Sequence, residues 1–273
     1  MPEPQFKFDM EPVEKCPLCG SSSKSDHFKT TAAGGDAVTI VKCKTCTLVY
    51  LDPAPTRKSL SAFYGSVYLT PEYRKLDGAR YTDPRQEIAA SFQTMEQHVD
   101  LIKEYKVPSG RMLDIGCSYG AFLIEATSRG WSTEGIEPFE EGVEFCRGNL
   151  GLKVIQGEIP DADLPSESYD VITMWEIIEH LPEPVAAMKK ANELAKLKGV
   201  LFITSPSADS PAARLLRERW IGLKLPTHLQ FFNYSTLARL LVATGWSPVK
   251  IKSGGGYAGQ IMAIAVKAHT DKG

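Results

Sequence analysis

The sequence has no excess charge of either sign. Its 31 basic residues stand against 33 acidic ones, a formal net charge of −2, and no block of like charges occurs along the chain. Proteins that bind DNA or RNA need clustered Lys and Arg to neutralise phosphates. The composition therefore argues against a nucleic acid as the main partner.

Long apolar segments are also missing. No stretch approaches the roughly 20 apolar residues that span a bilayer, and residues 1–30 contain no apolar signal-peptide core. We therefore expect no membrane partner and a cytoplasmic location. The chain also lacks internal repeats and low-complexity tracts, and nothing in it indicates an oligomeric state.

What is present is enough apolar material for one full α/β core and a small appendage: 273 residues, 43% of them hydrophobic. Strand and helix patterns alternate beyond residue 110, which predicts a Rossmann-like, largely parallel sheet with helices on both faces. The predicted strands are 111–115, 132–136, 152–155, 169–174, 199–204, 246–252 and 260–266, and the predicted helices are 119–129, 139–149, 184–196 and 234–244. The last two strands flank Gly254-Gly255-Gly256, and strands joined by so tight a turn must be antiparallel.

The chain is expected to divide into three parts: a small N-terminal module over 1–55, an aromatic linker with a helix over 56–108, and the α/β domain over 109–273. The helix, from 84 to about 106, follows from apolar residues at helical spacing, with Asp83 as its cap and Pro84 in its first turn. The linker contains Tyr64, Tyr68, Tyr73 and Tyr81. These tyrosines could cover a bound ligand, but aromatic packing between the N-terminal module and the α/β domain is the simpler explanation for most of them.

The six cysteines include two close pairs, Cys16 with Cys19 and Cys43 with Cys46. Paired C-x-x-C motifs in a chain without a secretory signal favour a metal site over disulfides. Four thiolates complete a tetrahedral zinc site and leave no open position, so we expect a structural Zn²⁺ held by a zinc ribbon. Unligated thiols or a redox pair are the alternatives, but the thioredoxin-like context of a redox pair is missing. Gly20 tolerates the positive φ of such a turn, and the segment between the pairs fits a β-hairpin.

Residues typical of a ligand-binding site lie at the carboxyl ends of the first three predicted α/β strands. After the first strand, Gly116 and Gly120 allow close approach of a ligand, in the crevice where open α/β sheets bind small molecules. Asp114 in front of this loop would repel a pyrophosphate and suits a cationic ligand with an amino group. Glu137 ends the second strand, where a carboxylate accepts hydrogen bonds from ribose hydroxyls. Glu158 follows the third strand, where an adenine ring would lie.

The region from 111 to 204 resembles class I S-adenosylmethionine-dependent methyltransferases. The resemblance rests on L-D-I-G-C-S-Y-G at 113–120, G-I-E-P at 135–138, the G-E-I-P segment from 157, and the strand–loop Y-D-V-I-T-M-W-E-I-I-E-H-L-P-E-P from 169. It implies a seven-stranded sheet with one antiparallel strand. It also implies S-adenosyl-L-methionine as cofactor, with the methionine part near Asp114, Gly116 and Gly120, the ribose on Glu137, and the adenine near Phe139 and Glu158. Trp175, at the end of the fourth strand, completes the cofactor-binding set. Where the family often has Asp-Ala at the adenine position, this chain has Glu158-Ile159.

Methyl transfer needs alignment of the nucleophile and, for an OH or CH acceptor, removal of a proton. Glu176, Glu179 and His180 follow the fourth strand and would share one face of a helical turn. They resemble the E-x-x-E-H of ubiquinone-pathway O-methyltransferases, which is associated with a divalent ion. Structural roles are favoured over metal binding here, with His180 left open as a base or substrate contact.

His228 is the second catalytic candidate, in P-T-H-L-Q-F-F at 226–232. The segment resembles the E-H-x-x-x-F of sugar C-methyltransferases, which also carry a four-cysteine ribbon, although Thr227 here occupies the Glu position. An imidazole suits proton removal at neutral pH, whereas the alternative is a core or capped histidine. The long connection 205–232, with Arg214 and Trp220, is equally consistent with a lid over an acceptor and with a surface helix.

Small-molecule methylation, on O or C of a sugar, nucleotide-sugar or other metabolite, is the leading hypothesis. An rRNA methyltransferase is the enzymatic alternative, but it would want a basic face, against a pI of about 6.2. A non-catalytic binding protein on the same fold is the other alternative. It is disfavoured because the acidic and glycine positions of the proposed cofactor site are all intact. The fold alone does not name the acceptor.

Overall fold

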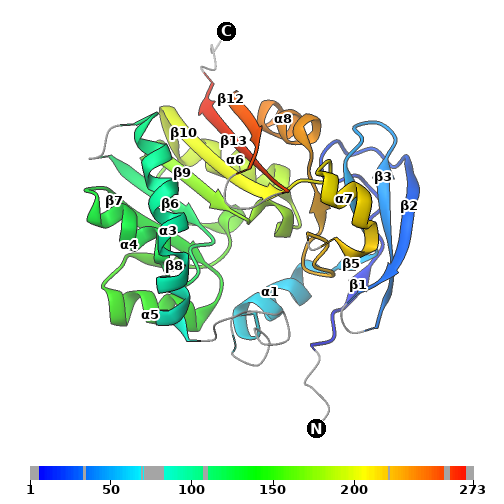
Figure 1. Ribbon diagram of the computed structural model, residues 1–273, viewed down its shortest axis with the longest axis horizontal. Coiled ribbons are helices and arrows are strands. Elements are labelled where there is room, and N and C mark those ends of the chain that lie inside the picture. Colours follow the sequence, from blue (N-terminus) through cyan, green and yellow to red (C-terminus); the bar gives the residue numbers. More distant parts are fainter. Residues whose placement is uncertain are drawn as a thin grey trace. The chain divides into compact units, whose positions relative to one another are not determined.

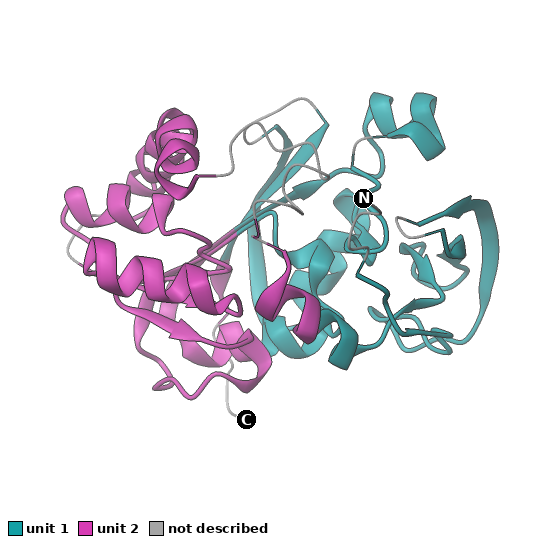
Figure 2. Cartoon of the chain, turned by 90° about the horizontal axis from the view of Figure 1, so that it is seen from below, with its two compact units in different colours: residues 1–60, 175–189, 203–265 teal, residues 61–174, 190–202, 266–273 magenta. Residues whose placement is uncertain are grey.

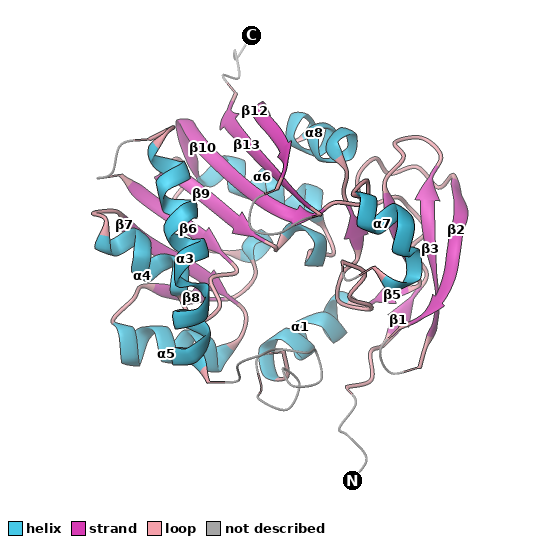
Figure 3. Cartoon of the chain, in the orientation of Figure 1, coloured by secondary structure: helices cyan, strands magenta, loops and turns pink. Residues whose placement is uncertain are grey.

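The computed structural model describes residues 6–32, 35–68, 70, 83–106, 110–220, 222–254 and 259–268 (Figure 1, Figure 3). Its first elements are β1 (Met10–Glu11), β2 (Lys24–Thr31), β3 (Ala37–Cys43), β4 (Val49–Asp52), β5 (Ala54–Pro55), α1 (Arg57–Ser66) and α3 (Pro84–Lys103). The middle elements are β6 (Arg111–Ile115), α4 (Ala121–Ser128), β7 (Ser132–Glu137), α5 (Glu140–Leu150), β8 (Val154–Gln156), η1 (Ile159–Asp161), β9 (Tyr169–Trp175), η2 (Ile178–His180) and α6 (Pro184–Leu194). The last are β10 (Ala195–Pro206), α7 (Pro211–Leu216), η3 (Arg217–Arg219), β11 (Gln230–Phe231), α8 (Tyr234–Ala243), β12 (Trp246–Ser253) and β13 (Gln260–Lys267).

The larger sheet has seven strands in the order β12-β13-β10-β9-β6-β7-β8. β6 pairs in parallel with β7 and β9, and β7 pairs in parallel with β8. β12 and β13 form the terminal hairpin, closed by a hydrogen bond of 2.8 Å from the Gly254 N–H to the Gln260 carbonyl. The predicted Rossmann-like, mostly parallel sheet with an antiparallel end is confirmed.

The smaller sheet has four antiparallel strands in the order β11-β4-β3-β2. β2 and β3 form the hairpin that the sequence predicts between the two cysteine pairs. β11 comes from far along the chain and pairs with β4, with Gln230 opposite Tyr50 and Phe231 opposite Val49. The N-terminal module therefore incorporates a strand that its own sequence does not contain.

The chain forms two compact units, each built from several segments (Figure 2). The first comprises residues 1–60, 175–189 and 203–265, and the second comprises 61–174, 190–202 and 266–273. Within the first unit, Ile40, Leu48 and Phe232 are fully buried, and within the second, Met112, Leu113 and Phe202 are. The predicted contiguous parts 1–55, 56–108 and 109–273 stay a prediction.

The start of α3 follows the predicted local signals, and α8 also has capping residues at its ends. The Asp83 side chain caps α3 by accepting hydrogen bonds from the N–H groups of Arg85 and Gln86, and Pro84 occupies the first turn. Asn233 caps α8 in a reciprocal capping box with Thr236. Gly245 follows this helix with a φ of +84°, as a left-handed terminating glycine should.

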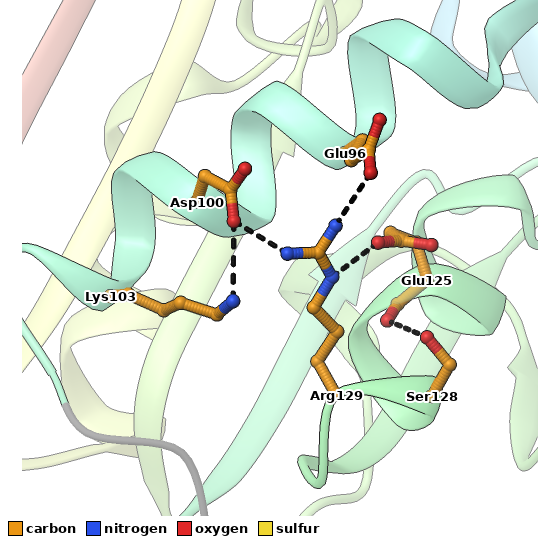
Figure 4. A network of polar contacts seen from close by, with 6 residues as sticks. All are labelled: Glu96, Asp100, Lys103, Glu125, Ser128 and Arg129. Atoms are coloured by element: carbon orange, nitrogen blue, oxygen red, sulfur yellow. Dashed lines mark hydrogen bonds and ion pairs between the residues drawn. The ribbon is translucent and has the colours of Figure 1, made fainter.

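A polar network joins α3 to α4 (Figure 4). The guanidinium of Arg129, just after α4, contacts Glu96 at 3.0 Å, Asp100 at 2.5 Å and Glu125 at 2.5 Å. Glu125 is only 4% exposed. Arg129 is therefore the cation that allows this carboxylate to be buried between the two helices.

Some element bounds differ from the predicted ones. The helix predicted over 184–196 ends at Leu194, and β10 begins at Ala195 rather than at residue 199. Within residues 195–198, the Lys196 ammonium binds Asp170 of β9 at 2.8 Å. Helical periodicity cannot detect such a partner. The helix α1 was not predicted, whereas α7 and β2 correspond to the surface helix in 205–232 and to one strand of the hairpin, for which no bounds were predicted.

Two predicted features lie outside the described residues: Tyr73 and Tyr81 of the aromatic linker, and Gly255 with Gly256 of the last turn. Among the described residues, no helix combines the length and the apolar character that a bilayer span requires.

Candidate active site

The loop between β6 and α4 is shaped by left-handed backbone at three positions. Gly116, Ser118 and Gly120 have φ values of +76°, +49° and +78°. At Gly120 a Cβ atom would also come within 2.7 Å of the Leu152 Cδ1 atom, so no larger residue fits without displacing its neighbours. The N–H of Gly116 donates to the Ile136 carbonyl at 2.8 Å, which ties the loop to β7. The two glycines therefore meet the conformational demand that the sequence motif predicts.

Asp114 lies on β6 directly opposite Thr173 of β9 and is 2% exposed. Its Oδ1 accepts a hydrogen bond of 2.6 Å from the Thr173 hydroxyl. Burial raises the pKa of Asp114 to about 7, and the nearby Glu137 carboxylate adds to the rise. Thr173 was not among the predicted site residues, because its position opposite Asp114 depends on which strand lies beside β6.

Glu137 ends β7 and connects the first two strand ends. Its Oε2 accepts from the Ser118 N–H at 2.8 Å, and its Oε1 accepts from the Phe139 N–H at 3.0 Å. The side chain is 6% exposed. Burial raises the pKa of Glu137 to about 7, although the two backbone donors oppose this rise. The carboxylate thus holds the glycine loop against the turn after β7, while each oxygen keeps further acceptor capacity.

Phe139 and Glu158 make side-chain contacts that were not predicted from the sequence. Phe139 is buried with Tyr119, and Tyr68 packs against this pair. The Glu158 carboxylate accepts a hydrogen bond from the Ser61 hydroxyl of α1. The helix α1 was not predicted, and Ser61 has no sequence signal that would associate it with Glu158.

In the N-terminal module the four cysteine sulfurs gather at one point. All four lie within 4.8 Å of one another. The Sγ atoms of Cys16 and Cys46 are 3.5 Å apart, and those of Cys19 and Cys43 are 3.6 Å apart. Gly20 has a φ of +73°, as predicted for the turn after the first pair. The sequence prediction that these four residues converge is confirmed.

His180 and His228, which the sequence offers as separate candidates, lie against each other in the first unit. Their ring centroids are 4.5 Å apart and the rings are nearly perpendicular, at 86°. The Nδ1 atom of His180 is 2.9 Å from the Thr227 carbonyl oxygen, and that of His228 is 2.9 Å from the Gly222 carbonyl oxygen. A carbonyl only accepts, so each Nδ1 carries the proton.

The backbone explains why these histidines meet. The Leu229 N–H donates to the Glu179 carbonyl at 2.8 Å, and the Leu229 carbonyl accepts from the Leu51 N–H at 2.9 Å. The residue after His228 is thereby hydrogen-bonded both to η2 and to β4. Burial lowers the pKa of His180 to about 4 and, together with the neighbouring His180, lowers that of His228 well below its usual 6.5. Both imidazoles are therefore neutral at pH 7.

The helical turn expected to align Glu176, Glu179 and His180 is not formed. Glu176 has a φ of +58° and lies before η2, so the three residues do not share a helical face. The Glu176 Oε1 atom instead accepts a hydrogen bond of 2.6 Å from the Gln260 amide. Glu179, and not Glu176, lies near the two histidines: one side-chain atom from each of Glu179, His180 and His228 lies within 4.8 Å of the other two.

Two predicted features remain, Trp175 and the connection 205–232. Trp175 is the last residue of β9 and is partly buried. The connection 205–232 contains the short surface helix α7, none of whose residues is buried. This is the surface helix that the sequence analysis considered, and a lid role stays a hypothesis.

Asp114 on β6, the glycine loop after that strand and Glu137 at the end of β7 thus lie together at one end of the parallel strands. A family model described as a methyltransferase domain matches residues 85–251. The chain belongs to this methyltransferase family. The enzyme class and the fold predicted from the sequence are confirmed at the level of the family.

Relatives of the methyltransferase include a ubiquinone biosynthesis O-methyltransferase of Bordetella bronchiseptica, 28% identical over 135 residues. That match covers 46% of this chain and 56% of the relative, so the chain spans little more than half of the relative's length. The enzyme of the same name from Actinobacillus pleuropneumoniae is 33% identical over 106 residues, 35% of this chain and 45% of its own.

Solved structures share the fold at low sequence identity. The magnesium protoporphyrin IX methyltransferase of Synechocystis PCC 6803, solved with bound SAH, has a TM-score of 0.59 and 17% identity. It covers 78% of this chain and 100% of its own. A SAM-dependent methyltransferase of Methanosarcina mazei has a TM-score of 0.54 and 18% identity, covering 62% of this chain and 98% of its own.

Proposed function

We propose that this methyltransferase transfers a methyl group from S-adenosyl-L-methionine to a small-molecule acceptor. The observation that supports the proposal best is the Glu137 carboxylate. Its two oxygens are positioned by backbone N–H donors from the glycine loop and from the turn after β7. A buried acid so fixed presents its remaining acceptor positions in one orientation, which suits the paired hydroxyls of a ribose.

The other proposed cofactor-binding residues fit the cofactor's chemistry. Gly116 and Gly120 keep side chains out of a loop whose backbone must approach a ligand. Asp114 supplies negative charge for the ammonium of the methionine part, and Phe139 and Glu158 are proposed near the adenine. Trp175 is proposed as a further contact. When bound, the cofactor supplies an electrophilic methyl group, and the residues named here bind and orient it.

The acceptor is proposed to be small. The relatives named above are described as enzymes of ubiquinone biosynthesis, and one structural neighbour as a magnesium protoporphyrin IX methyltransferase. Both names denote methylation of small molecules. A sugar, nucleotide-sugar or other metabolite, methylated on O or C, is compatible with the site. A net charge of −2 does not favour an RNA acceptor.

For the four-cysteine cluster we propose a structural Zn²⁺. Zn–S bonds of about 2.3 Å in a tetrahedron place sulfurs about 3.8 Å apart, close to the two separations given above. Four thiolates leave no position for a substrate. The ion would therefore stabilise the N-terminal module and take no part in catalysis.

His228 and His180 are the residues that we propose act on the acceptor. Both imidazoles are neutral at pH 7, and neutrality is needed to accept a proton or to bind an electrophile through Nε2. Their Nδ1 contacts to backbone carbonyls fix the orientation of both rings.

The cofactor assignment is tested by calorimetry with S-adenosyl-L-methionine on the Glu137→Ala variant. Loss of the ribose acceptor should weaken binding by about 1.5–3 kcal/mol, the range for hydrogen bonds to a charged group. Glu134→Gln is the matched control, because Glu134 lies on the same strand but binds Arg111 and Tyr169. Unchanged affinity in a folded Glu137→Ala protein would contradict the assignment. A screen of acceptors by product mass then identifies the substrate and the methylated atom.

A further inference from the structure

The cluster of Glu179, His180 and His228 has the composition of a metal site. Each residue offers one ligand atom, and the three atoms lie within 4.8 Å of one another. Glu179 and His180 come from η2, whereas His228 comes from the segment just before β11. The Leu229–Glu179 backbone hydrogen bond holds these two parts of the first unit together. The three side chains therefore meet through the tertiary structure and not through one local motif.

Both imidazoles are oriented as metal-binding histidines usually are. A ligating histidine commonly donates its second ring nitrogen to a backbone carbonyl or a carboxylate, which fixes the tautomer and the ring plane. Here the Nδ1 atoms of His180 and His228 bind the Thr227 and Gly222 carbonyl oxygens. Ligation would then use Nε2 of each ring.

Glu179 provides an independent observation. Its side chain is 1% exposed, and neither carboxylate oxygen meets the geometry of a hydrogen bond to a described residue; the Ser205 hydroxyl is the donor that acts on it, and that hydroxyl is itself buried without a geometric partner. The charge of Lys224 acts on it, but Lys224 is an exposed residue and donates no hydrogen bond to these oxygens. A buried carboxylate without a partner is strongly unfavourable. A cation held between Glu179 and the two imidazoles removes that penalty.

We propose that Glu179, His180 and His228 bind a divalent first-row transition cation. Two imidazoles and one carboxylate suit Fe²⁺, Co²⁺, Ni²⁺ and Zn²⁺ and leave coordination positions for water or an oxygen of a bound molecule. His180 is only partly buried, so the cluster is not closed to solvent on its side.

This site differs from one built on Glu176, Glu179 and His180. Glu176 has left-handed backbone and its carboxylate is bound by the buried Gln260 amide. His228 takes the place that Glu176 would have. The proposal concerns metal binding alone and holds whether or not the chain transfers methyl groups.

The experiment adds Co²⁺ to the full chain after its cysteine cluster has been loaded with Zn²⁺. We expect one Co²⁺ per chain, with weak visible bands typical of nitrogen and oxygen ligands. Strong near-ultraviolet thiolate bands would show Co²⁺ at the cysteines instead. His228→Asn and Glu179→Gln should each reduce Co²⁺ affinity by at least about tenfold. Glu176→Gln, the matched control, should leave it unchanged.

Both test variants are chosen to keep the fold. Asn at 228 keeps a donor for the Gly222 carbonyl but removes Nε2, and Gln at 179 removes a buried charge without a change of size. Co²⁺ should also raise the unfolding temperature of the unaltered protein but not of these variants. No Co²⁺ beyond the cysteine cluster, or equal Co²⁺ affinity in both folded variants, would overturn the proposal. Loss of Co²⁺ in Glu176→Gln alone would also overturn it.

Discussion

The titration of Glu137 makes cofactor binding dependent on pH. Burial raises its pKa from 4.5 to about 7, so the side chain is partly protonated near neutrality. The ionised form is the better acceptor for ribose hydroxyls. Affinity for S-adenosyl-L-methionine should therefore fall as pH falls through 7, by about tenfold between about pH 8 and about pH 6, and calorimetry across this range checks it.

The stability of the unliganded protein should respond in the opposite direction. A carboxyl whose folded pKa lies above its ordinary value stabilises the fold fully below about pH 4.5, and that contribution is lost as pH rises through 7. Glu137→Gln should bind weakly with a shallower pH dependence. Some slope should remain because burial also raises the pKa of Asp114 to about 7. A flat affinity profile in the unaltered protein contradicts the role of both acids.

His228 should matter for turnover more than for cofactor binding. We expect His228→Asn to lower kcat by about 10²–10⁴-fold and to leave the cofactor dissociation constant nearly unchanged. The Asn variant keeps the contact to Gly222, which separates loss of Nε2 from loss of packing. His180→Asn is the natural comparison, since it keeps the contact to Thr227. Full turnover of the His228 variant with its acceptor would rule out the catalytic assignment.

At the level of elements, the Arg129 network controls how firmly α3 is held on α4 (Figure 4). Arg129→Ala should lower the urea midpoint of unfolding, because it leaves the buried Glu125 carboxylate without its cation. The loss should shrink at high salt only in part, since that carboxylate is shielded from solvent ions. Lys103→Ala is the control: Lys103 is exposed and contacts Asp100 alone in this network, so its effect should be small. Equal midpoints for the two variants would contradict this account.

Several elements could be derived from local sequence, and others could not. The strands β6, β7 and β9 and the helices α3 and α8 agree with their predicted spans to within three residues at each end, because apolar periodicity and capping residues act within a few positions. The start of β10 at Ala195 differs from the prediction, and β11 is a strand through its pairing with β4. Two-residue strands carry no periodicity to detect.

At the scale of the whole molecule, the proposed zinc should stabilise β11 as well as the N-terminal strands, because β11 pairs with β4. Removal of the ion by a chelator should raise hydrogen exchange in β3 and β4, since metal binding supplies much of the folding energy of such modules. The increase should spread to β11 and His228, which are hydrogen-bonded to β4 through Leu229 and Phe231. β6 and β7 should stay protected. Mass spectrometry of exchanged peptides checks this, with elemental analysis expected to find one zinc per chain.

The pattern of hydrogen exchange after zinc removal distinguishes a local from a global role of the ion. Uniform loss of protection in both sheets would show that the ion supports the entire fold, contrary to the expectation of a local effect. Cys117→Ala is the control for zinc content, because Cys117 is buried in a hydrophobic cluster of the second unit, whereas the four clustered cysteines belong to the first. Its zinc content should equal that of the unaltered protein, whereas Cys43→Ser should lose the ion.

The sequence by itself determined the features that depend on near neighbours. The C-x-x-C pairs, the glycine loop after β6 and the acid at the end of β7 are local patterns with a direct chemical meaning, and the methyltransferase resemblance of the later segments agrees with the family model over residues 85–251. Tertiary structure alone decided which side chains share a site. Thr173 beside Asp114, Ser61 on Glu158, and Glu179 with His180 and His228 are contacts between distant segments. Such contacts depend on strand order and on burial summed over the whole chain, and no short window of sequence contains that information.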